Sequence, residues 1–241
     1  MYDPKRILSF PALLNARDLG GYPTLDGART RYRSLLRSDD LAQLTSAGLE
    51  ALCNYGVETV VDLRWPEEIA ASPTPITGAL KHIRYEQISL LTPTPKEWRA
   101  RRAADKAKEL WNRAMLEKVR EELKQVLAVM AGASSGPLLF HCMAGKDRTG
   151  VIAALMLALA DVVPEAIAYD YTVSTENLLE PYLQRYPDFE PAEVIDAVQC
   201  PEAGIHNMLA YLGQFGGTQA YLAEIGVPRE QIERLRARLR D

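Results

Sequence analysis

The segment 137–150, PLLFHCMAGKDRTG, is followed directly by the apolar run 151–160, VIAALMLALA. A short apolar run such as 137–140 predicts a buried strand. The run 151–160 is apolar on every side, which is typical of a buried helix rather than one on the surface. The sequence therefore predicts a strand, a loop and a buried helix in succession, an arrangement from which α/β domains are built.

Residues 141–150, between this strand and this helix, have the features of an anion-binding loop. A helix N-terminus presents unpaired backbone N–H groups and the positive end of the helix dipole. A loop that curls over this end can turn further N–H groups inward, and small residues such as Ala144 and Gly145 let the backbone approach an anion closely. A thiol at the bottom of the loop, at Cys142, would then lie in a field that favours the nucleophilic thiolate.

Three further residues of the loop suit it to phosphoryl transfer. Arg148 lies six positions after Cys142, and its planar guanidinium can hold two oxygens of a phosphate. Thr149 can donate a hydrogen bond to the sulfur, and Lys146 adds a second cation at the rim of the loop. These residue types predict transfer of a phosphoryl group to Cys142, followed by hydrolysis of the phosphocysteine. The residues predicted to bind the phosphate are Met143, Ala144, Gly145, Lys146, Asp147, Arg148 and Thr149.

Such a reaction also needs a carboxylic acid that protonates the leaving oxygen. Asp147 is one candidate, because it lies in the loop itself. Asp62 is the second, since it lies at the carboxyl end of the predicted strand 57–63, where open α/β sheets bind ligands. A structural ion pair between Asp62 and Arg64, bracing the loop from below, is the alternative interpretation of that residue. Glu67, which follows a Trp-Pro pair, is a third candidate.

The composition is that of a soluble globular protein. Of the 241 residues, 47% are hydrophobic and 25% are charged, which excludes a disordered or fibrous chain. Lys and Arg number 28 and Asp and Glu number 32, so the net charge is −4 and nucleic acid is not an expected partner. The three cysteines, Cys53, Cys142 and Cys200, form neither a disulfide framework nor a zinc motif, and we expect no metal and no other cofactor.

Neither a cleavable signal nor a transmembrane segment is predicted. The start of the chain, MYDPKRILSF, lacks the apolar run of a secretory signal. The longest apolar block, 151–160, is about half as long as the roughly 20 residues that cross a bilayer. We therefore expect a cytoplasmic protein, with export by a route that uses no cleaved signal as the alternative.

The rest of the chain predicts strands before the loop and helices after it. Asp26 and Gly27 are typical of a tight hairpin turn, and Thr45 and Gly56 are placed to begin and end a helix. Apolar residues at steps of three and four predict one long helix over about 95–130. Strands are predicted at 31–36, 57–63 and 82–86, and further helices from Pro164 and around 205–212, 221–225 and 232–239. No linker divides the chain, so we expect a single domain over residues 1–241 with a helical insertion at about 95–131.

The segment HCMAGKDRTG resembles the phosphate-binding loop of the cysteine-dependent protein tyrosine phosphatases, and it looks most like that of the atypical tyrosine and lipid phosphatases of bacteria and fungi. Other segments similar to that family, in the same order, are NARDLGGY (15–22), RSDDLAQLT (37–45), VVDLRWPEE (60–68) and MLAYLGQFGGTQAYLAEIGV (208–227). The resemblance implies a mostly parallel central sheet flanked by helices, with Cys142 as the nucleophile and Arg148 as the phosphate-binding residue. It also implies that the substrates are proteins phosphorylated on tyrosine, serine or threonine, or phosphoinositides.

Two other functions are compatible with the loop. A domain that binds phosphorylated partners without cleaving them would need Arg148 but not the thiol of Cys142. Enzymes that transfer sulfur or reduce arsenate also have a cysteine above a helix N-terminus. Such chemistry usually requires a second thiol, and neither of the other cysteines is close to Cys142 in sequence. Among phosphatase substrates, Lys146 and the basic residues between 96 and 108 favour molecules with more than one phosphate.

Overall fold

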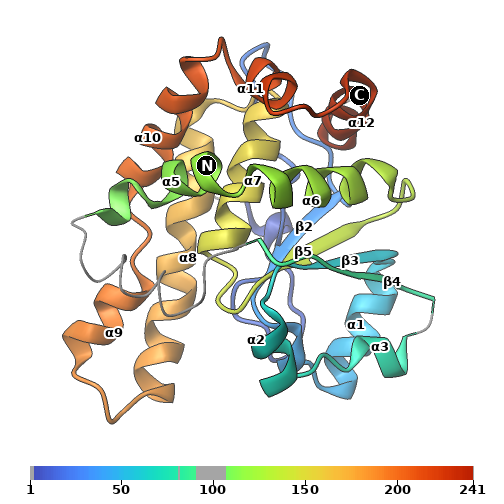
Figure 1. The fold of residues 1–241 in the computed structure, drawn as a ribbon. Coiled ribbons are helices and arrows are strands. Elements are labelled where there is room, and N and C mark those ends of the chain that lie inside the picture. The colour runs from blue at the N-terminus through green and yellow to red at the C-terminus, as the bar shows by residue number, and fades with distance from the viewer. Residues whose placement is uncertain (1–2, 81, 91–106, 241) are drawn as a thin grey trace.

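The computed structural model describes residues 3–80, 82–90 and 107–240. Its five-stranded sheet has the strand order β1-β2-β5-β3-β4. β1 (Arg17–Asp18) is antiparallel to β2 (Leu35–Ser38), whereas β2, β5 (Leu138–His141), β3 (Thr59–Asp62) and β4 (Arg84–Gln87) run parallel to one another. The mostly parallel sheet confirms the predicted α/β fold, and its middle strand is the one that leads into the loop 141–150 (Figure 1).

The four parallel strands end level with one another. Ser38 of β2, His141 of β5, Asp62 of β3 and Gln87 of β4 are paired in register across the sheet. The carboxyl ends of parallel strands form the edge at which α/β proteins bind ligands. The segments that follow β2, β3 and β5 therefore meet at one edge of the sheet, although they are far apart in the sequence.

Alternate residues of the strands contribute to two apolar layers, one on each face of the sheet. In β5, Leu138 and Phe140 lie in the larger hydrophobic cluster, and Leu139 between them lies in the smaller one. In β3, Val61 belongs to the larger cluster and Val60 to the smaller one. Burial of both faces explains why these strands are apolar runs without polar alternation.

Helices cover both faces of the sheet. α1 (Ser46–Tyr55) and α3 (Ile76–Ala79) pack on the smaller cluster, and α6 (Arg120–Gly132) and α7 (Asp147–Leu159) pack on the larger one (Figure 1). α1 begins after Thr45, whose hydroxyl accepts a hydrogen bond from Gly48 N, and ends at Gly56, which has a φ of +87°, as predicted. Eleven of the 13 residues of α7 are buried, which confirms the prediction of a buried helix after the loop.

The second half of the chain is helical, as predicted. The other α-helices of the described residues are α2 (Pro66–Ala71), α5 (Trp111–Lys118), α8 (Pro164–Arg185), α9 (Pro191–Val198), α10 (Glu202–Gly213), α11 (Thr218–Glu224) and α12 (Arg229–Leu239). Short 3-10 helices occupy Pro4–Arg6, Leu41–Gln43 and Ala107–Glu109. No helix in the described part of the chain is long and apolar enough to cross a membrane.

Two predicted elements differ from the structure. The single helix predicted over 95–130 is wrong where it can be compared, because α5 ends at Lys118 and α6 begins at Arg120, with non-helical dihedral angles at Val119 between them. Val119 is fully buried, so the apolar periodicity continues across this break and conceals it. Residues 95–106 of that prediction, with most of the basic run, lie outside the described residues. The strand predicted at 31–36 begins later, because β2 covers Leu35–Ser38.

Candidate active site

Cys142 is the first residue after the middle strand of the sheet, and its side chain is almost fully buried. Thr149, in the first turn of α7, donates a hydrogen bond from its Oγ1 to Cys142 Sγ over 3.1 Å. The two residues are adjacent because the loop from β5 bends back over the N-terminus of α7. A hydroxyl in this position stabilises negative charge on the sulfur.

The carbonyl groups of the loop are held by donors outside the loop. Asp40 N donates to Met143 O over 3.0 Å, and Asn15 Nδ2 donates to Ala144 O and Gly145 O over 3.0 and 3.1 Å. Within the described residues, the backbone N–H groups of 143–146 donate to no protein acceptor. The carbonyl groups therefore point away from the centre of the loop, and the amide groups remain available to an anion.

Gly145 allows the loop to pass close to β2. Its φ is +65°, which favours glycine, and a Cβ at this position would lie 2.4 Å from Ser38 O. No other residue fits this approach without movement of the backbone. The loop therefore owes its shape to contacts at the carboxyl end of β2 as well as to its own sequence.

Two buried arginines and one aspartate lie behind the loop. Arg37 donates to Gly145 O and to Asp170 Oδ2, and Arg17 Nε donates to Asp170 Oδ1 over 2.8 Å. Burial raises the pKa of the Asp170 carboxyl, but the charges of the two arginines outweigh this effect and lower the pKa to about 2. Two cations and one anion leave one net positive charge behind the loop, which favours an anion bound in it.

Arg148 is held at one edge of its guanidinium by Glu68. Nη1 and Nη2 donate to the two carboxylate oxygens of Glu68 over 2.6 and 2.8 Å, and Nη1 also donates to Leu63 O over 3.2 Å. The ring of Trp65 lies against the face of the guanidinium, with its centroid 4.7 Å from Cζ. Burial lowers the pKa of Arg148, but the charges of Cys142 and Glu68 outweigh this effect and raise it above its ordinary value.

This arrangement leaves a two-donor edge of Arg148 without a protein partner. The Nε–H group and the second N–H of Nη2 lie side by side in the guanidinium plane. Among the described residues, neither group donates to a protein acceptor. Two adjacent N–H groups match two oxygens of a phosphate, so the edge has the geometry that the predicted role of Arg148 requires.

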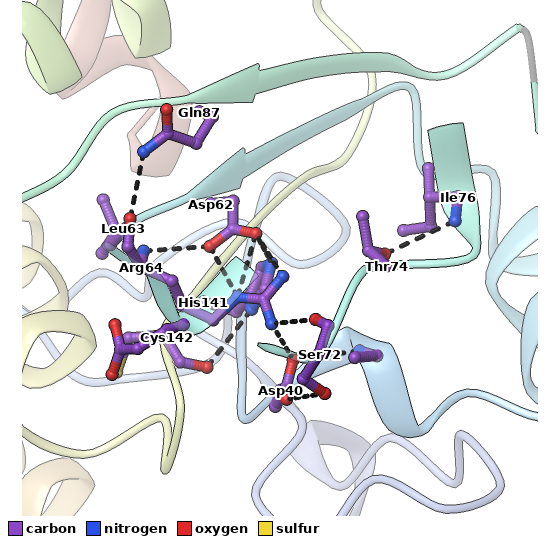
Figure 2. A network of polar contacts seen from close by, with 12 residues as sticks. Asp40, Asp62, Leu63, Arg64, Ser72, Thr74, Ile76, Gln87, His141 and Cys142 are labelled. Carbon is purple, nitrogen blue, oxygen red and sulfur yellow. Dashed lines mark hydrogen bonds and ion pairs between the residues drawn. The ribbon is translucent and has the colours of Figure 1, made fainter. Parts of the chain in front are cut away.

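Asp62 lies at the same edge of the sheet, in a buried polar network (Figure 2). Its carboxylate accepts hydrogen bonds from Arg64 Nη2 over 2.7 Å and from Tyr85 Oη over 2.6 Å, and it lies 3.4 Å from His141 Nε2. Arg64 also pairs with Asp40 over 2.7 Å. Burial raises the pKa of the Asp62 carboxyl, but His141 and Arg64 outweigh this effect and hold the pKa well below its ordinary value. An ionised carboxylate paired in this way is poorly suited to donating a proton.

Asp147 is the first residue of α7, and its side chain is partly exposed. Lys146 Nζ lies 3.1 Å from Asp147 Oδ1 and 3.5 Å from Gln199 O. The Lys146 side chain is 5% exposed, so its ammonium does not lie at an open rim as the sequence analysis expected. Glu67, the third acid candidate, is exposed on α2.

Four residues that support this site were not predicted from the sequence: Glu68, Asn15, Arg37 and Asp170. Glu68 follows Trp65 by three residues and accepts a hydrogen bond from Trp65 N over 2.8 Å. A glutamate at the third position of a helix is a recognisable capping signal. Asn15 lies in a segment that the sequence analysis quoted, but its contact with the loop crosses more than 120 residues and has no local signal.

The chain is similar to several known phosphatases. It is 32% identical over 224 residues to a tyrosine-protein phosphatase of Nostoc commune, with 86% of this chain and 74% of that protein covered. It is 24% identical over 277 residues to the triple specificity protein phosphatase PtpB of Mycobacterium tuberculosis, with 95% and 98% covered. Among solved structures it is similar to P. aeruginosa TpbA in complex with pTyr, with a TM-score of 0.36, 20% identity, and 58% of this chain and 70% of that chain covered.

The mostly parallel sheet brings Cys142 and Arg148 to one loop, an arrangement that is compatible with a cysteine-dependent phosphatase. The model of the tyrosine phosphatase family matches residues 8–241, which is nearly the whole chain. The chain belongs to the tyrosine phosphatase family. The resemblance found in the sequence is thereby confirmed at the level of the family.

Proposed function

We propose that this protein hydrolyses phosphomonoesters through a phosphocysteine intermediate on Cys142, without a metal ion, and that phosphotyrosine is its main substrate. The observation that carries the proposal is the buried sulfur of Cys142, which accepts a hydrogen bond from Thr149. It lies beside a loop whose backbone N–H groups donate to no protein acceptor among the described residues. Arg148 supplies the remaining positive charge, and its unpaired edge suits two phosphate oxygens. Amides and a guanidinium aimed at the transferring oxygens supply the charge stabilisation on which such reactions depend.

The reaction has two steps. In the first, the Cys142 thiolate attacks phosphorus, a sulfur–phosphorus bond forms, and the bond from phosphorus to the ester oxygen breaks. The leaving oxygen takes a proton from the carboxylic acid of Asp147. In the second, water attacks phosphorus, the Asp147 carboxylate takes the proton of that water, and the sulfur leaves as a thiolate that Thr149 stabilises. Inorganic phosphate is the product, and the enzyme returns to its initial state.

Asp147 is the better proton donor of the acid candidates. Asp147 is the first residue of the helix that carries Arg148, and its side chain is partly exposed, so solvent weakens its ion pair with Lys146. Asp62 is fully buried and held as an anion by Arg64. We therefore assign Asp62 and Arg64 to bracing the segment that follows β3.

Replacing Asp147 with asparagine is expected to lower kcat by about 10²- to 10³-fold on substrates with a poor leaving group, such as phenyl phosphate. The loss is expected to shrink on aryl phosphates whose leaving oxygen needs no proton, such as 2,4-dinitrophenyl phosphate. The measurement is kcat across a series of aryl phosphates of graded acidity. Asp62→Asn serves as the comparison, since a structural role lowers all the rates alike. A loss that depends on the leaving group in Asp62→Asn, but not in Asp147→Asn, would exchange the two assignments.

Glu68 is proposed to position Arg148 rather than to take part in the chemistry. Its carboxylate is itself fixed by Trp65 N, so the guanidinium is held in one plane before a phosphate arrives. A guanidinium that is already held in place loses less side-chain entropy when it binds a phosphate than a mobile one does.

Replacing Glu68 with glutamine is expected to weaken inorganic phosphate as a competitive inhibitor by about tenfold, because it removes one charged partner of Arg148. Glu67→Gln is the matched control: Glu67 is the preceding residue, is exposed, and makes no contact with Arg148 among the described residues. The inhibition constant of phosphate is measured for both variants. Tighter phosphate binding in Glu68→Gln would mean that Glu68 competes with the substrate instead of positioning the arginine.

The proposed activity is tested by phosphate release from p-nitrophenyl phosphate in the presence of a chelator, and then by rates on a phosphotyrosine peptide, a phosphoserine peptide and phosphoinositide vesicles. We expect activity that the chelator does not change, with the highest kcat/KM on the phosphotyrosine peptide and slower turnover of the other two. Binding of the phosphopeptides without any phosphate release would instead identify a domain that binds phosphorylated partners without cleaving them.

A further inference from the structure

A row of aromatic side chains that the chemistry described above does not use lies at the C-terminal end of α8 and just beyond it. The rings of Tyr182 and Tyr186 lie 5.5 Å apart between centroids, and those of Tyr186 and Phe189 lie 6.0 Å apart, both in edge-to-face geometry. Tyr186 is 40% exposed and Phe189 is 59% exposed. Exposed aromatic rings that gather in one place mark a binding surface more often than isolated exposed residues do.

This row begins beside the active site, because α8 runs along the loop. Asp170 and Ser174 of α8 contact Arg17 behind the loop. One turn further, Asn177 donates to Oδ1 of Asn15, the residue that holds two carbonyl groups of the loop. Tyr182 follows Asn177 by five residues, about 7.5 Å along the helix axis.

Tyr182 also lies within electrostatic reach of the site. Burial raises the pKa of its phenol, and the charges of Tyr186, Asp39 and Cys142 raise it further. Asp39 binds the backbone of Leu14 and Asn15 next to the loop. Tyr182 follows the buried residues Ser174 and Leu178 by eight and four positions, so it lies on the same side of α8 as Ser174, which contacts Arg17 behind the loop, and the two other rings continue the row away from it.

The charges around the row favour a peptide over an anionic lipid surface. The residues near Tyr186 and Phe189 include three exposed acids, Asp188, Glu190 and Glu193, and one exposed base, Arg185. A phosphoinositide-containing membrane is negatively charged and would be repelled by this excess of acids. A peptide with apolar or basic side chains is attracted to aromatic rings in acidic surroundings.

We propose that Tyr182, Tyr186 and Phe189 form a docking ledge for a phosphotyrosine peptide; this inference rests on the proposed function of the site. The phenyl ring of the substrate lies at Tyr182 when its phosphate is in the loop, and a neighbouring apolar or basic side chain of the peptide lies on Tyr186 and Phe189. The ring-to-ring steps are comparable with the roughly 6.8 Å between alternate residues of an extended peptide. The ledge thus selects among peptides, while the loop binds the phosphate.

The test compares wild type with the double variant Tyr186→Ser and Phe189→Ser. The matched control is Ile195→Ser, a similarly exposed apolar residue on α9. We expect KM for a phosphotyrosine peptide with flanking leucine and lysine to rise about tenfold in the double variant, against less than about twofold for p-nitrophenyl phosphate. Ile195→Ser is expected to match wild type on both substrates.

A second measurement keeps the two proposals separable. The dissociation constant of the same peptide is measured by fluorescence anisotropy on the Cys142→Ser protein, with and without the ledge substitutions. An equal loss on both substrates, no loss at all, or a loss confined to phosphoinositide vesicles would each overturn the ledge. If wild type turned over neither substrate, the proposed function would fail, and the anisotropy measurement would still decide whether the ledge binds the peptide.

Discussion

Replacing Cys142 with serine will lower phosphatase turnover by at least about 10⁴-fold and leave phosphate binding in place. Serine lacks the thiolate that attacks phosphorus, and removing the nucleophile of a covalent mechanism abolishes nearly all catalysis. The amide groups of the loop and the free edge of Arg148 do not depend on the sulfur, so phosphate should still bind. Turnover is measured on p-nitrophenyl phosphate, and binding is measured by calorimetry with inorganic phosphate.

Cys200→Ser is the matched control for this substitution, because Cys200 is also a buried cysteine that forms no disulfide. It is expected to keep turnover within about threefold of wild type, because its thiol takes no part in the proposed steps, although Cys200 lies within electrostatic reach of Lys146 and Asp147. If Cys142→Ser retained full turnover, the nucleophile would have to be another group. If Cys200→Ser lost turnover as completely as Cys142→Ser, a second thiol would belong to the mechanism, as in sulfur or arsenate chemistry.

Replacing Arg148 with lysine is expected to lower kcat/KM by about 10³-fold, although the charge is kept. The loss of one donor to a transition-state oxyanion costs about 10²- to 10³-fold, and lysine cannot supply two parallel N–H groups. Lysine also cannot keep the two-point contact with Glu68 while it reaches a phosphate. The measurement is kcat/KM on p-nitrophenyl phosphate together with the inhibition constant of phosphate.

Arg185→Lys, at the exposed end of α8, is the control for the loss of a guanidinium alone. It is expected to leave both constants within about twofold of wild type. Full activity in Arg148→Lys would show that a point charge is sufficient and that the planar fork has no role.

The loop could be predicted because its chemistry is local in the sequence. Cys142, Arg148 and Thr149 lie within eight residues, between a strand and a helix whose apolar patterns are clear. A short loop between two buried elements has few possible shapes. For this reason their adjacency, including the 3.1 Å contact from Thr149 to the sulfur, follows closely from the sequence.

The supporting residues could not be predicted, because their contacts depend on tertiary structure. Glu68 reaches Arg148 across 80 residues, and Asn15 reaches Ala144 across 129. These pairs come together only because strands from different parts of the chain end at one edge of the sheet. Asp62 also lies at this edge, near the loop. The sequence left open whether Asp62 is a proton donor or a structural partner of Arg64, and the ion pair between the two side chains is visible only in the structure.

The break between α5 and α6 shows a second limit. Periodicity reports which side of a helix is buried, and Val119 is buried although its backbone is not helical. Only a proline, a glycine or a capping residue would have indicated the break, and the sequence around Val119 has none of them.

The most direct test of the account is to trap the covalent intermediate. The protein is mixed with a phosphotyrosine peptide, quenched in acid within milliseconds, digested and analysed by mass spectrometry. The proposed mechanism predicts a phosphoryl group on Cys142, formed in a burst and absent from Cys142→Ser. A phosphoryl group on another residue, or product formed with no phosphorylated protein at any time in single-turnover conditions, would contradict it.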